Sequence, residues 1–187
     1  KQGHLIAIGN SGKDDSLLKY ITSGGMLSTE ERLRVLGYFK SGTSSTDDQS
    51  YGSANGVFTR IAHSGYSVEK TGNIFGQHVA YWHPSVLNET GTYSYDGDKY
   101  GNLDYLQSSN PLNPVDSLKK FTDTGNETLV QNSMSIIDHL EIMVFEDINK
   151  RNEAIQRLKA LGWEILRGLP IEDRLVMRND LDAAIAK

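Results

Sequence analysis

The segment Gly125-Asn126-Glu127-Thr128-Leu129-Val130, with the stretch from Met134 to Phe145 after it, decides the fold of this chain. The first segment opens a short apolar run with an acidic residue, and residues 140–145 are apolar enough for a buried strand. A carboxylate at the start of a strand that lines a cleft can stabilise a cation that develops during a reaction. Glu127 is therefore the first candidate for a catalytic residue.

Length and composition indicate an ordinary globular domain. With 187 residues, 37% of them hydrophobic and 23% charged, we expect residues 1–187 to form a single domain. The formal net charge of -5 argues against a surface that tracks phosphates in general, although a local basic patch stays possible. The chain has no cysteine, which excludes disulfides, thiolate zinc sites and cysteine nucleophiles. No stretch approaches the roughly 20 apolar residues of a membrane span, so we expect no membrane partner.

The first third of the chain begins with a strand and two helices. Residues 4–8 read as a short buried strand, which Gly9 and the residues after it should end. Asp14 to Thr22 has apolar residues at helical spacing, and Gly24-Gly25 is a typical helix stop. Ser28 and Glu31 form the pattern of a capping box, which predicts the start of a second helix.

Short strands and helices follow in no regular alternation. Residues 56–61 predict a compact strand, and short strands are expected at 79–82 and 86–87 inside a long, weakly periodic stretch from 64 to 114. The later part predicts a strand at 140–145, a helix at 150–161, a strand at 163–166 and a terminal helix at 180–186. Helices early and late with strands throughout favour an α+β fold over an alternating parallel one.

Several short motifs do not support the chemistry that they suggest. Residues 9–13, Gly-Asn-Ser-Gly-Lys, lack the spacing of a phosphate-binding P-loop. Residues 96–107 begin like a calcium loop but end on Gln107 instead of glutamate. His78 and His83 have no evident third ligand, so we predict no metal site. His4 can project into a cleft from the first strand, or it can be a partly exposed terminal residue.

Three segments together resemble the motifs of ADP-ribosyltransferases. His4-Leu5-Ile6-Ala7-Ile8, a helix and Ser23-Gly24-Gly25-Met26-Leu27 look like the first motif, in which a His or Arg on a strand precedes a helix and a glycine turn. Gly52 to Arg60 is similar to the second motif, a strand with an aromatic and Ser/Thr residues. Asn126 to Val130 resembles the third, which carries the catalytic glutamate. They occur in the family's order and touch most of the chain.

The resemblance implies a split β-sheet core with flanking helices and NAD as co-substrate. It assigns Glu127 as the catalytic residue, which would stabilise the oxocarbenium character of the ribose as nicotinamide leaves. It assigns NAD contacts to six further residues, with stacking on nicotinamide by Phe58 or a loop tyrosine, bracing by Thr59 and phosphate pairing by Arg60. These six are His4, Ile6, Gly25, Phe58, Thr59 and Arg60.

The acceptor of ADP-ribose is less determined than the co-substrate. Family members that modify arginine carry Glu or Gln two residues before the catalytic glutamate, and this chain has Gly125 there. The segment is closer to the single-glutamate branch, which includes DarT-like enzymes that modify DNA bases. We expect a macromolecular acceptor, protein or nucleic acid, with Lys119 to Asn126 as its contact. A toxin or effector role fits the resemblance, and the sequence leaves the compartment open. An NAD glycohydrolase and a non-catalytic binding domain are the alternatives.

Overall fold

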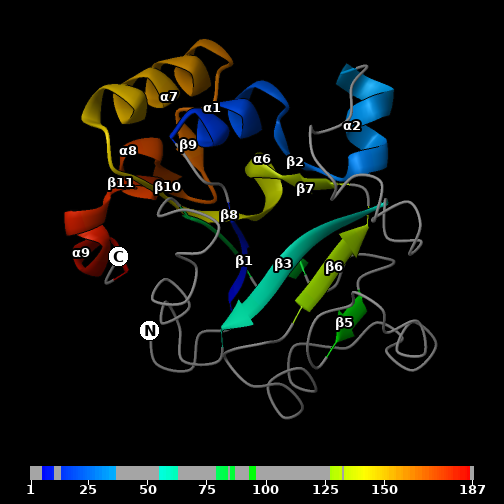
Figure 1. Ribbon diagram of the computed structural model, residues 1–187. Helices are drawn as coiled ribbons and strands as arrows, with labels where there is room; N and C mark the ends of the chain where they lie inside the picture. The colour runs from blue at the N-terminus through cyan, green and yellow to red at the C-terminus, as the bar shows by residue number, and fades with distance from the viewer. Residues whose placement is uncertain are drawn as a thin grey trace.

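The computed structural model contains one seven-stranded sheet with helices packed against it (Figure 1). It describes residues 6–10, 14–36, 55–62, 79–83, 85, 86, 93–95, 127–131 and 133–185. The strands of the sheet have the order β11-β8-β4-β1-β3-β6-β5. Their bounds are β1 (Ile6–Asn10), β3 (Gly56–Ala62), β4 (Val79–Trp82), β5 (Tyr93–Tyr95), β6 (Glu127–Gln131), β8 (Leu140–Phe145) and β11 (Leu175–Met177).

Two short ribbons and several helices complete the described part of the chain. One ribbon pairs β2 (Gly25–Leu27) with β7 (Ser133–Ser135), and the other pairs β9 (Ile165–Leu166) with β10 (Leu169–Pro170). In the main sheet, β11 and β8 are parallel, and the other described pairs are antiparallel. The helices are α1 (Asp14–Thr22), α2 (Thr29–Leu36), α6 (Ile136–His139), α7 (Ile148–Ala160), α8 (Ile171–Arg174), the 3-10 helix η4 (Arg178–Asp180) and α9 (Leu181–Ile185).

The hydrophobic core lies between the sheet and the pair of helices α1 and α7. These two helices pack against each other and lie side by side in Figure 1. Each fully buried large apolar side chain stabilises the fold by about 1.5–3 kcal/mol, so this layer accounts for much of the cohesion of the domain. The sheet contributes alternate residues to it, and the helices contribute apolar residues three or four apart. The principal members are Val57, Ala80, Trp82, Val130, Met143 and Phe145 from strands, and Leu18, Ile21, Ala154, Ile155 and Leu158 from helices.

Helix boundaries follow from capping residues in the sequence. The Ser28 side chain accepts a hydrogen bond from the Glu31 amide at 3.1 Å, which satisfies a free donor at the start of α2. The Asp147 carboxylate accepts from the Asn149 amide at 2.8 Å and caps α7 in the same way. Gly24, with φ of 75°, and Gly162, with φ of 85°, end α1 and α7 in the left-handed conformation that glycine adopts most readily.

Many of the predicted elements are confirmed. The helix at 14–22 and the strands at 79–82 and 140–145 have the predicted bounds, and the α+β class is correct. The first strand continues through Gly9 and Asn10, because both pair with β4, so the predicted end at Gly9 is wrong. The strand predicted at 86–87 is also wrong at Val86, which lies in a short 3-10 turn where its amide donates to the His83 carbonyl at 3.0 Å.

Some predictions concern residues outside the described part of the chain. These are His4, Leu87, most of the stretch from 64 to 114, and the proposed acceptor segment Lys119 to Asn126. Among the described helices, none is long and apolar enough to cross a membrane.

Candidate functional site

The three motif strands are neighbours in the sheet, although they lie far apart in the sequence. Strand β3 pairs with β1 on one side and with β6 on the other, so the segments at 6–8, 56–60 and 127–131 are contiguous. Ile8 pairs with Arg60, and Thr59 pairs with Thr128. If the register of β3 and β6 is extended by one residue, Arg60 lies opposite Glu127. On its other side, Glu127 pairs with Tyr95 of β5. Glu127 is the first residue of β6, as the sequence predicts.

The strand register divides the motif residues between the two faces of the sheet. Val57 belongs to the hydrophobic core, and Thr59, two residues on, is 5% exposed and lies on that same face of the sheet, which we term the core face. Phe58 lies on the opposite face, which we term the second face, where it pairs with the buried Leu129 and is itself half-buried. Alternation along β3 and β6 assigns backbone positions 60 and 127 to the second face as well.

The glycine turn of the first motif contacts β7 and the start of α6, which follow β6 in the sequence. Gly25 pairs with Ser135 in the β2–β7 ribbon, and the Gly24 carbonyl accepts a hydrogen bond from the Ile136 amide at 3.0 Å. A Cβ atom on Gly25 would lie 1.9 Å from the Met134 carbonyl oxygen. The close approach of the two strands therefore requires glycine at position 25 whether or not this residue contacts a ligand.

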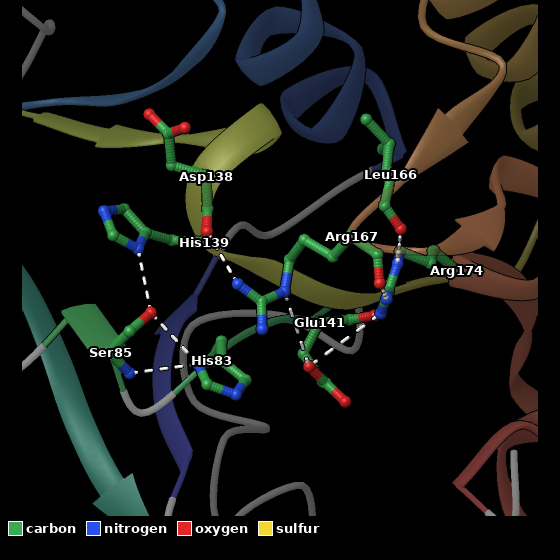
Figure 2. A network of polar contacts seen from close by, with 8 residues as sticks. All are labelled: His83, Ser85, Asp138, His139, Glu141, Leu166, Arg167 and Arg174. Carbon is green, nitrogen blue, oxygen red and sulfur yellow. Dashed lines mark hydrogen bonds and ion pairs between the residues drawn. The ribbon is translucent and has the colours of Figure 1, made fainter.

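A polar junction joins the end of β4 to the start of β8 (Figure 2). The Ser85 hydroxyl oxygen lies 3.0 Å from His83 Nδ1 and 3.1 Å from His139 Nδ1. The Ser85 amide donates to His83 Nδ1 at 3.1 Å, and the His83 amide donates to the His139 carbonyl at 2.6 Å. The sequence gives little warning of this cluster, because Ser85 and His139 are 54 residues apart. The sequence offers one local signal of the cluster: Ser85 follows His83 by two residues, so its amide can close a turn onto the histidine ring.

A buried arginine contacts the start of β8, two residues after His139. Arg174 is 5% exposed and donates to three carbonyls, those of Leu166, Glu141 and Arg167, the last two at 3.0 and 2.8 Å. Its guanidinium also lies 3.8 Å from the Glu141 carboxylate. Arg167, in the turn between β9 and β10, donates to the Asp138 carbonyl at 2.8 Å. These bonds fix the ends of β8, β9 and α6 relative to one another.

The structure brings together part of the predicted site. Four predicted site residues lie on the neighbouring strands β1, β3 and β6: Ile6, Phe58, Arg60 and Glu127. For Ile6, Arg60 and Glu127 this statement concerns the backbone position only. Thr59 lies on the core face, and Gly25 lies in the separate ribbon. His4 is outside the described residues. Among the residues that the structure describes, no group of three or more His, Cys, Asp or Glu side chains could hold a metal ion.

Comparison with known proteins finds similar solved structures and no match by sequence. No family model and no curated protein matches the sequence. DarT from Thermus sp. 2.9 in complex with NAD⁺ superposes with a TM-score of 0.55 at 11% identity, covering 96% of this chain and 98% of that one. The same protein in complex with ADP-ribosylated single-stranded DNA gives a TM-score of 0.56 at 12% identity, covering 95% of each chain.

A third solved structure extends the comparison to another organism. DarTG from Thermosipho africanus in complex with ADP-ribose has a TM-score of 0.51 at 11% identity, covering 93% of this chain and 49% of that one. At these identities the likeness establishes the fold. The predicted fold, an ADP-ribosyltransferase-like sheet with flanking helices, is confirmed.

Proposed function

We propose that this protein is an NAD-dependent ADP-ribosyltransferase that transfers ADP-ribose to a macromolecular acceptor and releases nicotinamide. One observation carries the proposal: the three motif strands are adjacent in a DarT-like fold, in the order β1-β3-β6, with Glu127 at the start of β6. The solved structures with this fold include complexes with NAD⁺ and with carba-NAD⁺, which supports NAD as the co-substrate.

The proposed reaction breaks the bond between nicotinamide and the ribose C1′ atom. Nicotinamide leaves with the bonding electron pair, the acceptor atom forms a new bond to C1′, and the acceptor loses one proton to solvent. Positive charge grows on the ribose before the new bond forms. A carboxylate at position 127 would stabilise that charge more in the transition state than in bound NAD, which is the requirement for a higher rate. Phe58 would stack on nicotinamide from the neighbouring strand.

Release of nicotinamide from NAD tests the catalytic assignment. Glu127→Gln keeps the size of the side chain and removes its charge, so we expect turnover to fall by about 100-fold or more. Glu164→Gln is the matched control, because Glu164 is an exposed carboxylate after α7 and lies away from the motif strands. Undiminished nicotinamide release by Glu127→Gln would contradict the proposal.

Nucleic acid is the acceptor that we propose to test first. A solved structure with this fold contains ADP-ribosylated single-stranded DNA, and Gly125 stands where arginine-modifying enzymes carry Glu or Gln. NAD labelled on adenine, offered with single-stranded DNA, RNA or protein, should transfer its label to DNA. Label that stays in free ADP-ribose with every acceptor would favour a glycohydrolase. Label found on protein alone would exclude DNA as the acceptor.

The segment just before Glu127 is the proposed contact for the acceptor. It contains two lysines and a phenylalanine, which can contact a phosphate backbone and stack on a base. Replacing Lys119, Lys120 and Phe121 by alanine should reduce labelling of the acceptor while nicotinamide release continues. Unchanged labelling by the triple variant would exclude this segment from acceptor binding.

A further inference from the structure

We infer that Ser85, held between His83 and His139, is a positioning residue for the proposed NAD site. The inference rests on the proposed function, because it concerns how the same strands are held for NAD. Ser85 acts through the two histidines rather than through a contact of its own with NAD. The predicted effect is on NAD affinity, and it requires a neutral His83 ring.

The hydrogen bonds at Ser85 determine which His83 nitrogen carries a proton. A backbone amide can only donate, and the Ser85 amide is directed at His83 Nδ1 at 3.1 Å. Nδ1 must therefore be an acceptor, which places the proton of the neutral ring on Nε2. The arrangement resembles an Asx turn, in which an Asn or Asp side chain accepts from the amide two residues later. Here an imidazole takes the place of the Asn side chain.

The junction links the two parts of the first motif. Trp82, the last residue of β4, pairs with Ala7 of β1 and with Leu140 of β8, so His83 follows directly from a position beside β1. On the other side of Ser85, His139 ends α6, whose first residue, Ile136, donates its amide to the Gly24 carbonyl. The contacts of Ser85 thus connect β1 with the glycine turn through β4 and α6.

Several charged residues lie near the start of β8, close in sequence to His139. Asp138 precedes His139, and its carbonyl accepts from Arg167 at 2.8 Å. The Glu141 carboxylate lies 3.8 Å from Arg174 and 4.0 Å from Arg167, so two guanidinium groups accompany one carboxylate there (Figure 2). The Ser85 side chain joins His139 to the end of β4, because both histidine Nδ1 atoms lie within hydrogen-bonding distance of its hydroxyl oxygen, and the His83 amide adds a backbone link to the His139 carbonyl.

Protonation of His83 would disrupt this arrangement. A charged imidazole carries N–H groups at both nitrogens, so Nδ1–H would face the Ser85 amide as a second donor. Histidine rings ordinarily gain this proton between about pH 7.5 and 5.5. We therefore expect NAD affinity to weaken on acidification over this range. An asparagine at position 83 can accept from the same amide but does not titrate there.

The experiment measures NAD binding by calorimetry and nicotinamide release in parallel, with the thermal unfolding midpoint of each variant. Ser85→Ala should weaken NAD binding about 5- to 10-fold, because one hydrogen-bonded link is lost. The substitution should also raise KM more than it lowers kcat. Ser133→Ala, at an exposed site in β7, is the control and should bind like wild type. Ser85→Thr retains the hydroxyl and should restore binding.

His83→Asn and His83→Ala separate positioning from general damage. At pH 7.5 we expect His83→Asn to bind NAD like wild type and His83→Ala to bind it more weakly. Between pH 7.5 and 5.5 the affinity of His83→Asn should change less than that of wild type. Equal NAD affinity in Ser85→Ala and wild type would overturn the inference, as would an unchanged acid response in His83→Asn.

The outcomes for the wild-type protein distinguish this inference from the proposed function. Wild-type protein that binds NAD but releases no nicotinamide would overturn the proposed transferase. The Ser85 variants would then still test the inference through binding. Wild-type protein that binds no NAD would overturn both.

Discussion

At the scale of single residues, Gly25 shows how one position can have a structural and a functional explanation together. The motif resemblance assigns it a contact with NAD, whereas its geometry requires glycine for the β2–β7 pairing. A Cβ atom there would lie 1.9 Å from a backbone carbonyl oxygen. Backbone of a paired strand cannot move aside as a flexible side chain can. The structural requirement therefore stands without any ligand.

Gly24 and Gly25 provide a matched pair of substitutions. Gly25→Ala should lower the free energy of unfolding by about 3 kcal/mol or more, because the ribbon must separate to admit the methyl group. Gly24→Ala meets no atom within 4 Å but must adopt φ of 75°, so its cost should be about 1–2 kcal/mol. Urea denaturation measures both values. A smaller effect at position 25 than at position 24 would contradict the close approach.

The sequence predicts the position of Glu127 and fails to reveal the cluster around Ser85. An acidic residue before an apolar run is a local pattern, and strand pairing leaves it at the start of β6. The Ser85 cluster depends on β4 and β8 becoming neighbours, and nothing within either segment specifies that partner. The same limit applies to Thr59, whose burial depends on which face of β3 joins the core.

At the scale of elements, local signals predict the long helices and buried strands but miss the shortest elements. Helix α1 has apolar residues at helical spacing and a glycine stop, so its bounds follow from its own sequence. Strands β2, β7, β10 and β11 have two or three residues each, too few for any periodicity to appear, whereas the strand predicted at 163–166 is present as the shorter β9 (Ile165–Leu166). They exist because tertiary pairing supplies their hydrogen bonds. The parallel pairing of β11 with β8 is an example.

Arg174 is the residue through which several of these short elements are held. Arg174→Met should lower the free energy of unfolding by about 3–5 kcal/mol, because three carbonyls and the Glu141 carboxylate would lose their buried partner. Arg157→Met is the control, since Arg157 forms an exposed pair with Glu153 and should change stability by about 1 kcal/mol or less. Denaturation of both variants by urea gives the comparison, and equal effects would contradict a bracing role for Arg174.

The contact between α7 and α8 predicts a small dependence of stability on pH. The hydrogen bond from Lys159 lowers the pKa of Glu172 below its ordinary value of 4.5 and raises the pKa of Lys159. A carboxyl group with a lower pKa in the folded state stabilises the fold above pH 4.5, and this contribution is lost as the pH falls through the folded value. For Lys159 the contribution is present below pH 10.5 and is lost as the pH rises through its higher folded value.

Glu172→Gln tests this dependence. The side chains of Lys159 and Glu172 are 43% and 42% exposed, so solvent screens the pair strongly. At pH 7 the variant should unfold at a midpoint lower by about 2 °C or less, and this difference should shrink as the pH is lowered toward 3. Thermal scans at the two pH values give the result. A difference that grows toward pH 3 would have the wrong sign for this ion pair.

At the scale of the whole molecule, the proposed function predicts that stability and chemistry depend on opposite faces of the sheet. The core face carries Val57, which belongs to the hydrophobic core, and the second face carries Phe58 and the backbone positions of Arg60 and Glu127. Neighbouring residues of one strand should therefore affect different properties of the protein. This separation follows from strand alternation combined with the burial of one face in the hydrophobic core.

Substitutions at the adjacent positions 57 and 58 test that separation. Val57→Ala should lower the free energy of unfolding by about 1–3 kcal/mol and leave nicotinamide release per folded molecule within about 2-fold of wild type. Phe58→Leu keeps apolar volume but removes the ring, so stability should change by less than about 1.5 kcal/mol. Its nicotinamide release at low NAD should fall about 10-fold, because stacking is lost. The reverse pattern would place the NAD site on the core face and would contradict this separation.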